Sequence, residues 1–349
     1  MTARTLTQYL LDAGRSGEQR GEFAHILSAV AVMVKQTAAM LSRGPLILDQ
    51  VSRPTPRAAK EVNRAVRRLA TKALFAHTVS ADQLAAISLS GDPVIYQVSE
   101  SGRYLLLFEA LHGLSNLVDN MTVGTAFSIM ERQSESGMVT EADFLQPGSR
   151  QVSAGIALFG PRTVMLVTTG QGVDGFTLDR ELGNFMLTHP QVTIPADAGI
   201  FSINAADSPH WPGPVGRYVD ECVQGEDGPR GRGFIMRWNA SALVGAFRVL
   251  NSGGLFLIPD TGQPTGWLAP LLHNAAPLAL LAEQAGGRSS TGTERVLDVM
   301  PTSLTARTPY FLGSASEVER IERYFAEHEQ GQDAQRSYPL FHNRSLFVD

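Results

Sequence analysis

Apolar residues at helical spacing dominate the first part of the chain. They recur every three or four positions in residues 6–11 and 23–34, which predicts two amphipathic helices ending near Gly44. A third helix is predicted over residues 57–74, and its basic residues also share one side. These residues are Arg57, Lys60, Arg64, Arg67 and Arg68. Such a stripe is typical of a solvated helix face or a subunit contact.

The middle of the chain has the pattern of short strands. Five apolar or aromatic residues run from Tyr104 to Phe108, which predicts a buried strand, and the Gly-Leu-Ser-Asn at 113–116 predicts a turn that can hold functional groups. More apolar runs alternate with turn signals at residues 124–129, 154–159, 163–170, 175–179 and 183–187. We therefore expect a meander of strands.

Helical and strand patterns are mixed after residue 195. Helices are predicted over residues 239–250, 277–285 and 316–327, and a strand over residues 254–258. The Gly-, Pro- and charge-rich residues 225–233 predict an exposed loop. Because no strand precedes it and no helix follows it closely, this loop does not fit a phosphate-binding Gly-rich motif.

Composition and charge narrow the class of protein. With 349 residues and 43% hydrophobic content, the chain can form one large domain or two closely packed ones. A net charge of -5 and a pI near 5.9 argue against general nucleic-acid binding. The single cysteine, Cys222, excludes an internal disulfide framework and a Cys-rich zinc site, and favours a reducing compartment.

Nothing in the N-terminal sequence predicts a leader or a membrane span. The first residues lack the contiguous apolar core of a secretory signal, and polar residues interrupt the apolar stretch of residues 23–41. These interruptions are His25, Lys35 and Gln36. We expect a cytoplasmic protein without a membrane partner.

One block carries a likeness to a known family. Residues 108–116 read Phe-Glu-Ala-Leu-His-Gly-Leu-Ser-Asn. This resembles the Asp-Pro-Leu-Asp-Gly-Ser-Ser-Asn signature of class I fructose-1,6-bisphosphatases. Other blocks that resemble bacterial members follow in the same order at residues 144–148, 151–155, 172–179, 201–204, 282–287 and 296–301. The chain is identified as a member of this family by these blocks together.

The resemblance implies a fold of the α/β class, the layered αβαβα sugar-phosphatase fold. Residues 1–195 are expected to form an α+β half that contains the metal-site segments. Residues 196–349 are expected to form an α/β half that contains the sugar-phosphate segments. The resemblance also implies a homotetramer.

The expected metal site has lost most of its acids. Removing phosphate from a sugar with water needs bound cations, and the magnesium of the family requires oxygen ligands, chiefly carboxylates. Leu89 and Ser90 replace two ligand glutamates, and Glu109 and His112 stand where the family has two ligand aspartates. A further ligand glutamate is replaced by Asn274, or by His273 after a one-residue shift. Asn63 replaces the aspartate that helps to activate water. Because only Glu109 keeps a carboxylate, we do not expect magnesium to bind in the family manner.

Substrate positions are partly retained. Those kept are Gly113, Ser115, Asn116, Asn204 and Arg237. The family's Gly-Lys-Leu-Arg phosphate segment falls at residues 266–269, or one residue later, and has no cation in either alignment. Two tyrosines of the sugar pocket become Trp238 and Ile258. Arg103-Tyr104 and Gly21-Glu22 match parts of the family's inhibitory nucleotide site, although Tyr104 also fits as the start of a buried strand.

Three functions follow from this sequence. The first is a fructose-1,6-bisphosphatase homologue of gluconeogenesis or the Calvin cycle that is inactive or strongly impaired, and that binds a sugar phosphate or regulates an active paralogue in a mixed oligomer. The second is an active sugar-bisphosphate phosphatase with a rebuilt manganese or zinc site at Glu109 and His112, with Asp92 or His273 nearby. The alternative for His112 is a loop histidine whose hydrogen bonds are all made within the protein. The third is a binding protein that uses the basic helix.

Overall fold

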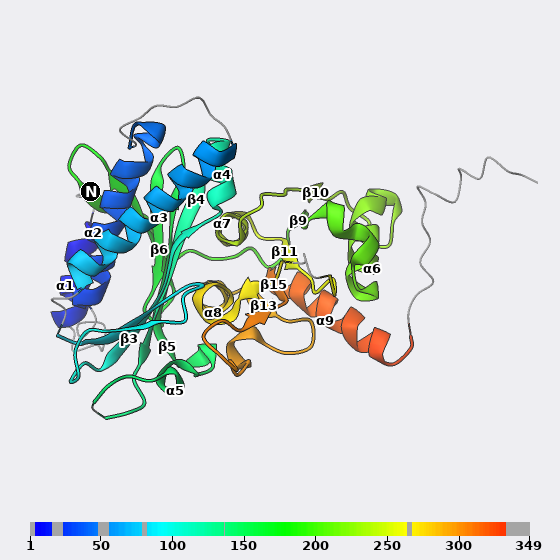
Figure 1. Cartoon of the computed structure of the whole chain (residues 1–349). Coiled ribbons are helices and arrows are strands. Elements are labelled where there is room, and N and C mark those ends of the chain that lie inside the picture. The colour runs from blue at the N-terminus through cyan, green and yellow to red at the C-terminus, as the bar shows by residue number, and fades with distance from the viewer. Residues whose placement is uncertain are drawn as a thin grey trace, which may run out of the picture.

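Helices and sheets alternate in five stacked layers, in the order helix, sheet, helix, sheet, helix (Figure 1). The computed structural model describes residues 4–15, 24–47, 56–78, 82–135, 137–263 and 267–332. The first layer contains α1 (Leu6–Arg15), α2 (Ala24–Leu41) and α3 (Pro56–Thr78). The central layer contains α7 (Ala242–Ser252) and α8 (Ala276–Gln284), and the last contains α6 (Gly213–Gln224) and α9 (Ala315–Glu329). This confirms the αβαβα fold expected from the sequence.

The first sheet has eight strands in the order β2-β1-β3-β4-β5-β6-β7-β8. Its strands are β1 (Leu84–Leu89), β2 (Ile95–Gln97), β3 (Tyr104–His112), β4 (Val123–Glu131), β5 (Gln151–Phe159), β6 (Thr163–Thr168), β7 (Val173–Asp179) and β8 (Asn184–His189). In this sheet β1 and β3 pair in parallel, and each of the other neighbouring pairs is antiparallel. The predicted meander is confirmed from β3 to β8.

The second sheet has five strands in the order β10-β9-β11-β15-β13. Its strands are β9 (Ile200–Ser202), β10 (Ile235–Met236), β11 (Leu255–Ile258), β13 (Arg288–Ser290) and β15 (Tyr310–Gly313). A separate pair is formed by β12 (Ala269–Pro270) and β14 (Arg307–Thr308). Shorter helices are α4 (Leu114–Val118), α5 (Glu141–Phe144) and 3-10 turns at Gly44–Ile47, Gly148–Arg150, Ala205–His210, Gly225–Asp227 and Val296–Asp298.

Apolar contacts on both faces of the first sheet make its strands continuously buried. On one face, α2 packs Ile26, Val30 and Val34 into a cluster with β3 residues such as Leu106 and Phe108. On the other face, a second cluster joins the sheet to α7 and α8. By length and composition α2 could cross a membrane, but it is a core helix here because half of it is buried inside the fold.

A bulge near the end of β3 decides which way its polar side chains point. Glu109 pairs with Ala126 and His112 pairs with Gly124, so three steps along β3 match only two along β4. Residues three apart on a regular strand face opposite sides of the sheet, but the extra residue returns His112 to the side of Glu109. The Thr125 hydroxyl stabilises the bulge by donating to the carbonyls of Glu109 and Ala110. The bulge therefore creates the Glu109–His112 pair.

A π-helix over Leu271–Ala275 leads into α8 and presents a second polar pair. Pro277 has no N–H to donate to the carbonyl of His273 four residues earlier, which favours the wider winding before it. His273 and Asn274 are both buried in this turn. The turn lies beside the end of β3, where Asn274 reaches Glu109.

Of two local predictions, one was wrong and the other was confirmed. The Gly-Leu-Ser-Asn predicted as a turn instead starts α4, because Gly113 adopts a left-handed φ of 75° from which the helix begins at Leu114. The loop predicted to be exposed at residues 225–233 contains no buried residue and most of it is exposed, although the guanidinium of Arg230 is buried and lies 2.5 Å from the Glu317 carboxylate of α9. An ion pair across two distant segments cannot be read from local composition.

Candidate functional site

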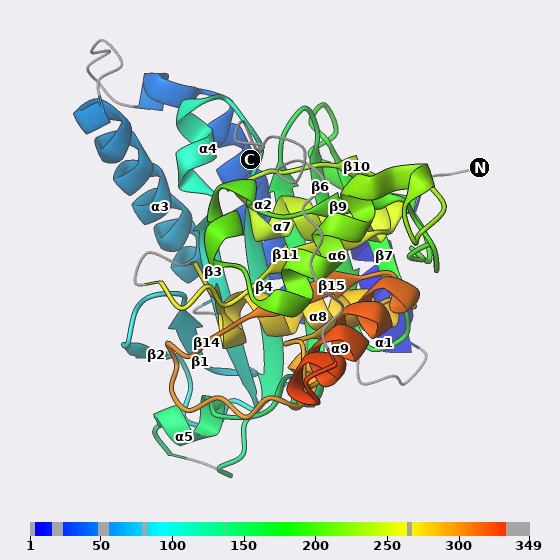
Figure 2. The same cartoon turned by 90° about the vertical axis from the view of Figure 1, so that its right-hand side faces the viewer.

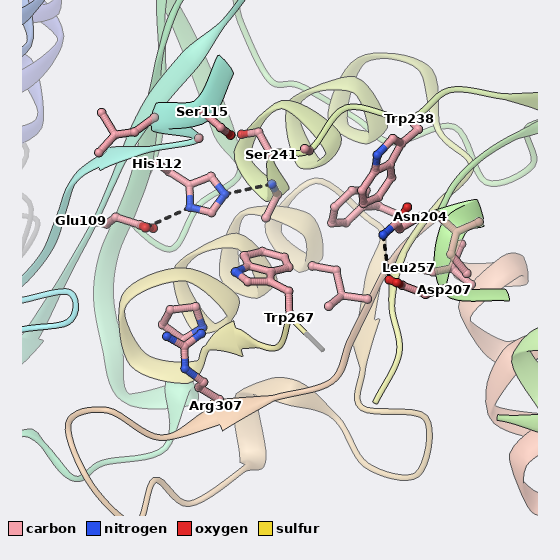
Figure 3. Close-up of a pocket in the computed structure, with 18 of the residues that line it drawn as sticks. Glu109, His112, Ser115, Asn204, Asp207, Trp238, Ser241, Leu257, Trp267 and Arg307 are labelled. Carbon is pink, nitrogen blue, oxygen red and sulfur yellow. Dashed lines mark hydrogen bonds and ion pairs between the residues drawn. The ribbon is translucent and has the colours of Figure 1, made fainter. Parts of the chain in front are cut away.

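A cavity of about 580 Å³ lies where β3 ends and α7 begins. Glu109, His112 and Ser115 line it from the first sheet and α4, and the start of α7 faces them (Figure 3). The chain has three tryptophans, and all three, Trp211, Trp238 and Trp267, line this cavity. A concave site with aromatic walls and a few polar groups is typical of small-molecule binding.

Glu109 and His112 form a buried polar pair at one end of the cavity. His112 Nδ1 lies 2.9 Å from Glu109 Oε1. The second carboxylate oxygen, Oε2, accepts a hydrogen bond of 2.8 Å from the Asn274 side-chain amide. Both oxygens of Glu109 therefore already have partners within the protein.

The hydrogen bonds of His112 assign its tautomer. The backbone N–H of Ala242, in the first turn of α7, donates to His112 Nε2 over 3.2 Å. Nε2 must then be the unprotonated nitrogen, so Nδ1 carries the proton and donates it to Glu109. Both ring nitrogens of His112 are consequently occupied, and the imidazole has no free lone pair for a metal ion.

Ionisation in this network follows from burial and from the hydrogen bonds. Burial raises the pKa of the Glu109 carboxyl, but the nearby His112 imidazole and the hydrogen bonds from His112 and Asn274 bring the net pKa below its usual value. Burial lowers the pKa of His273 to about 4, and its ring nitrogen lies 3.0 Å from the Ser88 hydroxyl. At neutral pH Glu109 is thus ionised and His273 is neutral.

These residues do not fit a magnesium ion. Such a cation takes several oxygen ligands, usually from more than one carboxylate. Glu109 is hydrogen-bonded to the His112 imidazole and the Asn274 amide, and the other carboxylate that lines the cavity, Asp207, accepts a hydrogen bond from Asn204. Among the residues that the structure describes, no group of three or more His, Cys, Asp or Glu side chains could hold a metal ion. Asp92, suggested as a further ligand, lines a different cavity and binds the Tyr96 hydroxyl.

The residues at the positions expected to hold metal ligands make other contacts in this structure. Leu89 is buried in the core between α3 and the first sheet. Ser90 lines the cavity, and its backbone carbonyl accepts a 2.9 Å hydrogen bond from Arg67. Asn63 donates to the carbonyl of Leu114 over 3.0 Å, which ties α3 to the start of α4. Asn63 does not line the cavity, so its amide acts as a positioning group.

The structure brings together some of the expected substrate residues. Gly113, Ser115 and Asn204 line the cavity. A Cβ at Gly113 would meet the Ser241 side chain at 3.3 Å, so this close approach also favours glycine. Asn204 turns its amide toward Asp207, to which it donates over 2.8 Å (Figure 3).

Two other expected substrate residues do not line the cavity. Asn116 is buried and donates to Asn239 Oδ1 over 2.9 Å. Arg237 is exposed next to β10, and its backbone N–H donates to the Phe201 carbonyl. Both positions are therefore retained in sequence without lining this cavity.

Sequence reasoning missed the aromatic character of the cavity and its two arginines. Trp238 was noted as a tyrosine replacement, but Trp211 and Trp267 were not connected with it. The Trp267 ring centroid lies 5.7 Å from that of His112, and Trp238 stacks nearly parallel to Phe256 at 6.3 Å. Arg67 and Arg307 supply positive charge to the lining. The concentration of a rare residue type in one half of the chain was the available signal.

The residues matched to a nucleotide site lie elsewhere. Tyr104 is buried at the start of β3, as the strand interpretation predicted. Arg103 is 3.1 Å from the Glu131 carboxylate and its guanidinium lies over the Tyr104 ring. Gly21, Glu22 and Gly266 lie outside the described residues.

Comparisons with known proteins agree with the blocks found in the sequence. The family model described as Fructose-1-6-bisphosphatase, N-terminal domain, matches residues 4–190, and the one described as the C-terminal domain matches residues 194–326. The holo form of Leishmania major fructose-1,6-bisphosphatase is 28% identical, with a TM-score of 0.82 over 93% of this chain and 99% of that chain. Its apo and T-state forms are 27% and 29% identical, each with a TM-score of 0.81 and the same coverage. Because the matched ranges span most of its length, the chain belongs to the fructose-1,6-bisphosphatase family.

Proposed function

We propose that this chain binds a phosphorylated sugar in the aromatic cavity and hydrolyses it poorly or not at all. The observation that carries the proposal is the hydrogen-bonded network in which both Glu109 oxygens and both His112 ring nitrogens have protein partners. At the positions that the resemblance assigns to metal ligands, the donor atoms bind one another and the N–H of Ala242. A site of this kind offers its polar groups to the protein itself.

Loss of the metal ligands raises the free-energy barrier of phosphate hydrolysis by a large amount. A bound cation stabilises the charge that develops on a transferred phosphoryl group and generates the attacking hydroxide, each with a contribution of roughly several kcal/mol. A rise of about 1.4 kcal/mol in the barrier slows a reaction tenfold. Loss of two or more cations from this chemistry therefore reduces turnover by many orders of magnitude.

Binding, by contrast, retains its physical basis. Trp238 and Trp267 offer flat apolar surface for the C–H faces of a sugar ring, and Ser115 and Ser241 offer hydroxyls. Arg67 and Arg307 supply positive charge for a phosphoryl end. Because Glu109 is ionised and would repel a phosphate, we expect the phosphoryl group to lie toward the arginines.

A binding protein of this kind can act in sugar metabolism as a regulator. In this proposal the chain assembles either as a homotetramer or in a mixed oligomer with an active paralogue of gluconeogenesis or the Calvin cycle. Co-expression of the two chains, one of them tagged, tests the mixed assembly. Recovery of the paralogue in stoichiometric amount supports it, and separate elution of two homo-oligomers contradicts it.

The direct test is phosphate release from fructose 1,6-bisphosphate by the purified chain, with magnesium, manganese and zinc in turn. We expect no release above that of a Glu109→Ala variant purified in parallel, which reveals any contaminating host phosphatase. Cation-dependent release that is abolished in Glu109→Ala would instead establish the active alternative with a rebuilt metal site. Chelation with EDTA followed by readdition of one cation would then identify the metal.

A further inference from the structure

A second cavity, of about 610 Å³, lies between α3 and the turn that joins β1 to β2. We call it the basic cavity, because Arg64, Arg67, Arg68 and Lys72 line it from one face of α3. Helix α3 runs along the edge of the molecule beside β1 and β2, as Figure 2 shows. Three residues of the predicted basic stripe, Arg64, Arg67 and Arg68, therefore belong to one wall of a cavity.

The positive charge of this cavity is not neutralised. Within the described ranges, no carboxylate pairs with Arg64, Arg68 or Lys72. Asp92 is the only acid among the described lining residues, and its oxygens accept hydrogen bonds from the Val94 N–H and the Tyr96 hydroxyl. Four cations next to one engaged carboxylate, in a chain with a net charge of -5, form a local attraction for anions.

Arg67 is held in place for a ligand. One of its terminal nitrogens donates to the Ser90 carbonyl over 2.9 Å, which fixes the guanidinium above the β1–β2 turn. Gly91 makes that turn with a left-handed φ of 75°, a conformation that favours glycine. A guanidinium with one N–H anchored keeps four further N–H donors, and its planar fork matches two phosphate oxygens.

We propose that the basic cavity binds the phosphoryl group of a small phosphorylated molecule without a metal ion. In this proposal, cationic side chains neutralise the phosphate charge, as bound metal ions do in phosphatases. These side chains are Arg64, Arg67, Arg68 and Lys72. The cavity exceeds the size of a phosphate ion, and the adjacent rings of Phe75 and Tyr96 give it an apolar wall. The basic cavity shares Arg67, Ser90 and Gly91 with the aromatic cavity, but Arg64, Arg68 and Lys72 line the basic cavity alone.

Calorimetric titration with inorganic pyrophosphate in the presence of EDTA tests the proposal. We expect one site per chain in the full-length protein. The affinity is expected to fall at least tenfold in the double variant Arg64→Gln/Arg68→Gln, and to fall with rising salt. The matched control is Arg43→Gln/Arg150→Gln, which removes the same charge from two exposed arginines away from the cavity and should bind as the wild type does.

Each other outcome overturns the proposal. Equal losses in both double variants would mean a general charge effect, and unchanged affinity in Arg64→Gln/Arg68→Gln would place pyrophosphate elsewhere. A large loss in Trp238→Ala, a residue of the other cavity, would assign the anion to the sugar-binding cavity. Tighter binding of a single-stranded oligonucleotide, lost in the same arginine variant, would make α3 a nucleic-acid surface. Thermal unfolding of every variant confirms that it remains folded.

Discussion

The two neighbouring cavities share Arg67, Ser90 and Gly91, yet they use polar groups in opposite ways. In the aromatic cavity, Glu109 and His112 are buried and their hydrogen-bonding atoms have protein partners. In the basic cavity, Arg64, Arg68 and Lys72 are exposed and, within the described residues, have no acidic partner. The first arrangement satisfies polar groups within the fold, whereas the second leaves positive charge available to an anion, which is the basis of the two proposals.

The pH dependence of stability should give the largest difference between the two cavities. The pKa of His273, which lies behind Glu109, is about 4 in the folded chain against 6.5 for an exposed histidine. Between those values the unfolded chain binds more protons, so stability falls as the pH decreases from 6.5 to 4. The expected loss is about 3 kcal/mol.

Chemical denaturation across this pH range, compared between wild type and His273→Gln, measures that loss. The variant should have a flatter profile, whereas the exposed control His25→Gln should follow the wild type. Glu109, whose pKa is lowered despite burial, chiefly by His112 and by hydrogen bonds, also stabilises less as the pH falls through its folded pKa, and this contribution persists in the variant. Parallel profiles for all three proteins would show that His273 is not buried as described.

Removal of Glu109 should affect stability more than removal of a cation from the basic cavity. Glu109→Ala leaves the His112 Nδ1–H and the Asn274 amide without their acceptor in a buried site, at a cost of roughly 1–3 kcal/mol. Arg68→Gln changes an exposed side chain and should stay within about 0.5 kcal/mol of wild type. Urea unfolding distinguishes the two. A stabilising effect of Glu109→Ala would indicate that the carboxylate is strained, as an empty metal ligand would be.

Aromatic truncation should act on one cavity only. Trp238→Ala removes a ring that lines the aromatic cavity, and the expected loss is about tenfold in affinity for fructose 1,6-bisphosphate, or ~1.4 kcal/mol. Pyrophosphate binding in the basic cavity should be unchanged. Quenching of tryptophan fluorescence provides the measurement, because all three tryptophans line the same cavity. If Trp238→Ala weakened the binding of both ligands, the two ligands would bind at the same site.

Substitution of Arg67, which lines both cavities, should weaken ligand binding in both, with a smaller effect than the changes above. Arg67→Gln removes a cation from both cavities and is expected to weaken both fructose 1,6-bisphosphate and pyrophosphate, by roughly threefold to tenfold each. Titration of the two ligands against the one variant checks this. An effect on pyrophosphate alone would show that ligand binding in the aromatic cavity relies on Arg307 for its charge.

Much of the scaffold could be predicted because it follows local patterns. The apolar run from Tyr104 to Phe108 identified β3, and the spacing of apolar residues identified α2 and α9 within a few residues of their ends. The order of the layers came from the family resemblance, since pairing between distant strands leaves no local pattern. The basic stripe of α3 was also visible, but its cavity needs the β1–β2 turn opposite to it.

The geometry of the site could not be predicted, because it depends on irregularities and on partners far along the chain. A bulge is a mismatch of register with β4, so one strand alone does not reveal that Glu109 and His112 share a face. Ala242 donates a backbone N–H, which is a group that every residue but proline has. Asn274 was placed at a ligand position by resemblance, and only the π-helix shows that its amide donates to Glu109.

The central claim is that Glu109 and His112 serve the protein rather than a cation. Electron paramagnetic resonance tests it directly, because free manganese in water gives a strong signal that binding suppresses. Titration of the purified chain with manganese should leave the signal proportional to added metal, with the same slope in wild type and Glu109→Ala. Loss of one equivalent of signal in wild type, restored in Glu109→Ala, would contradict the account and make this network a metal site.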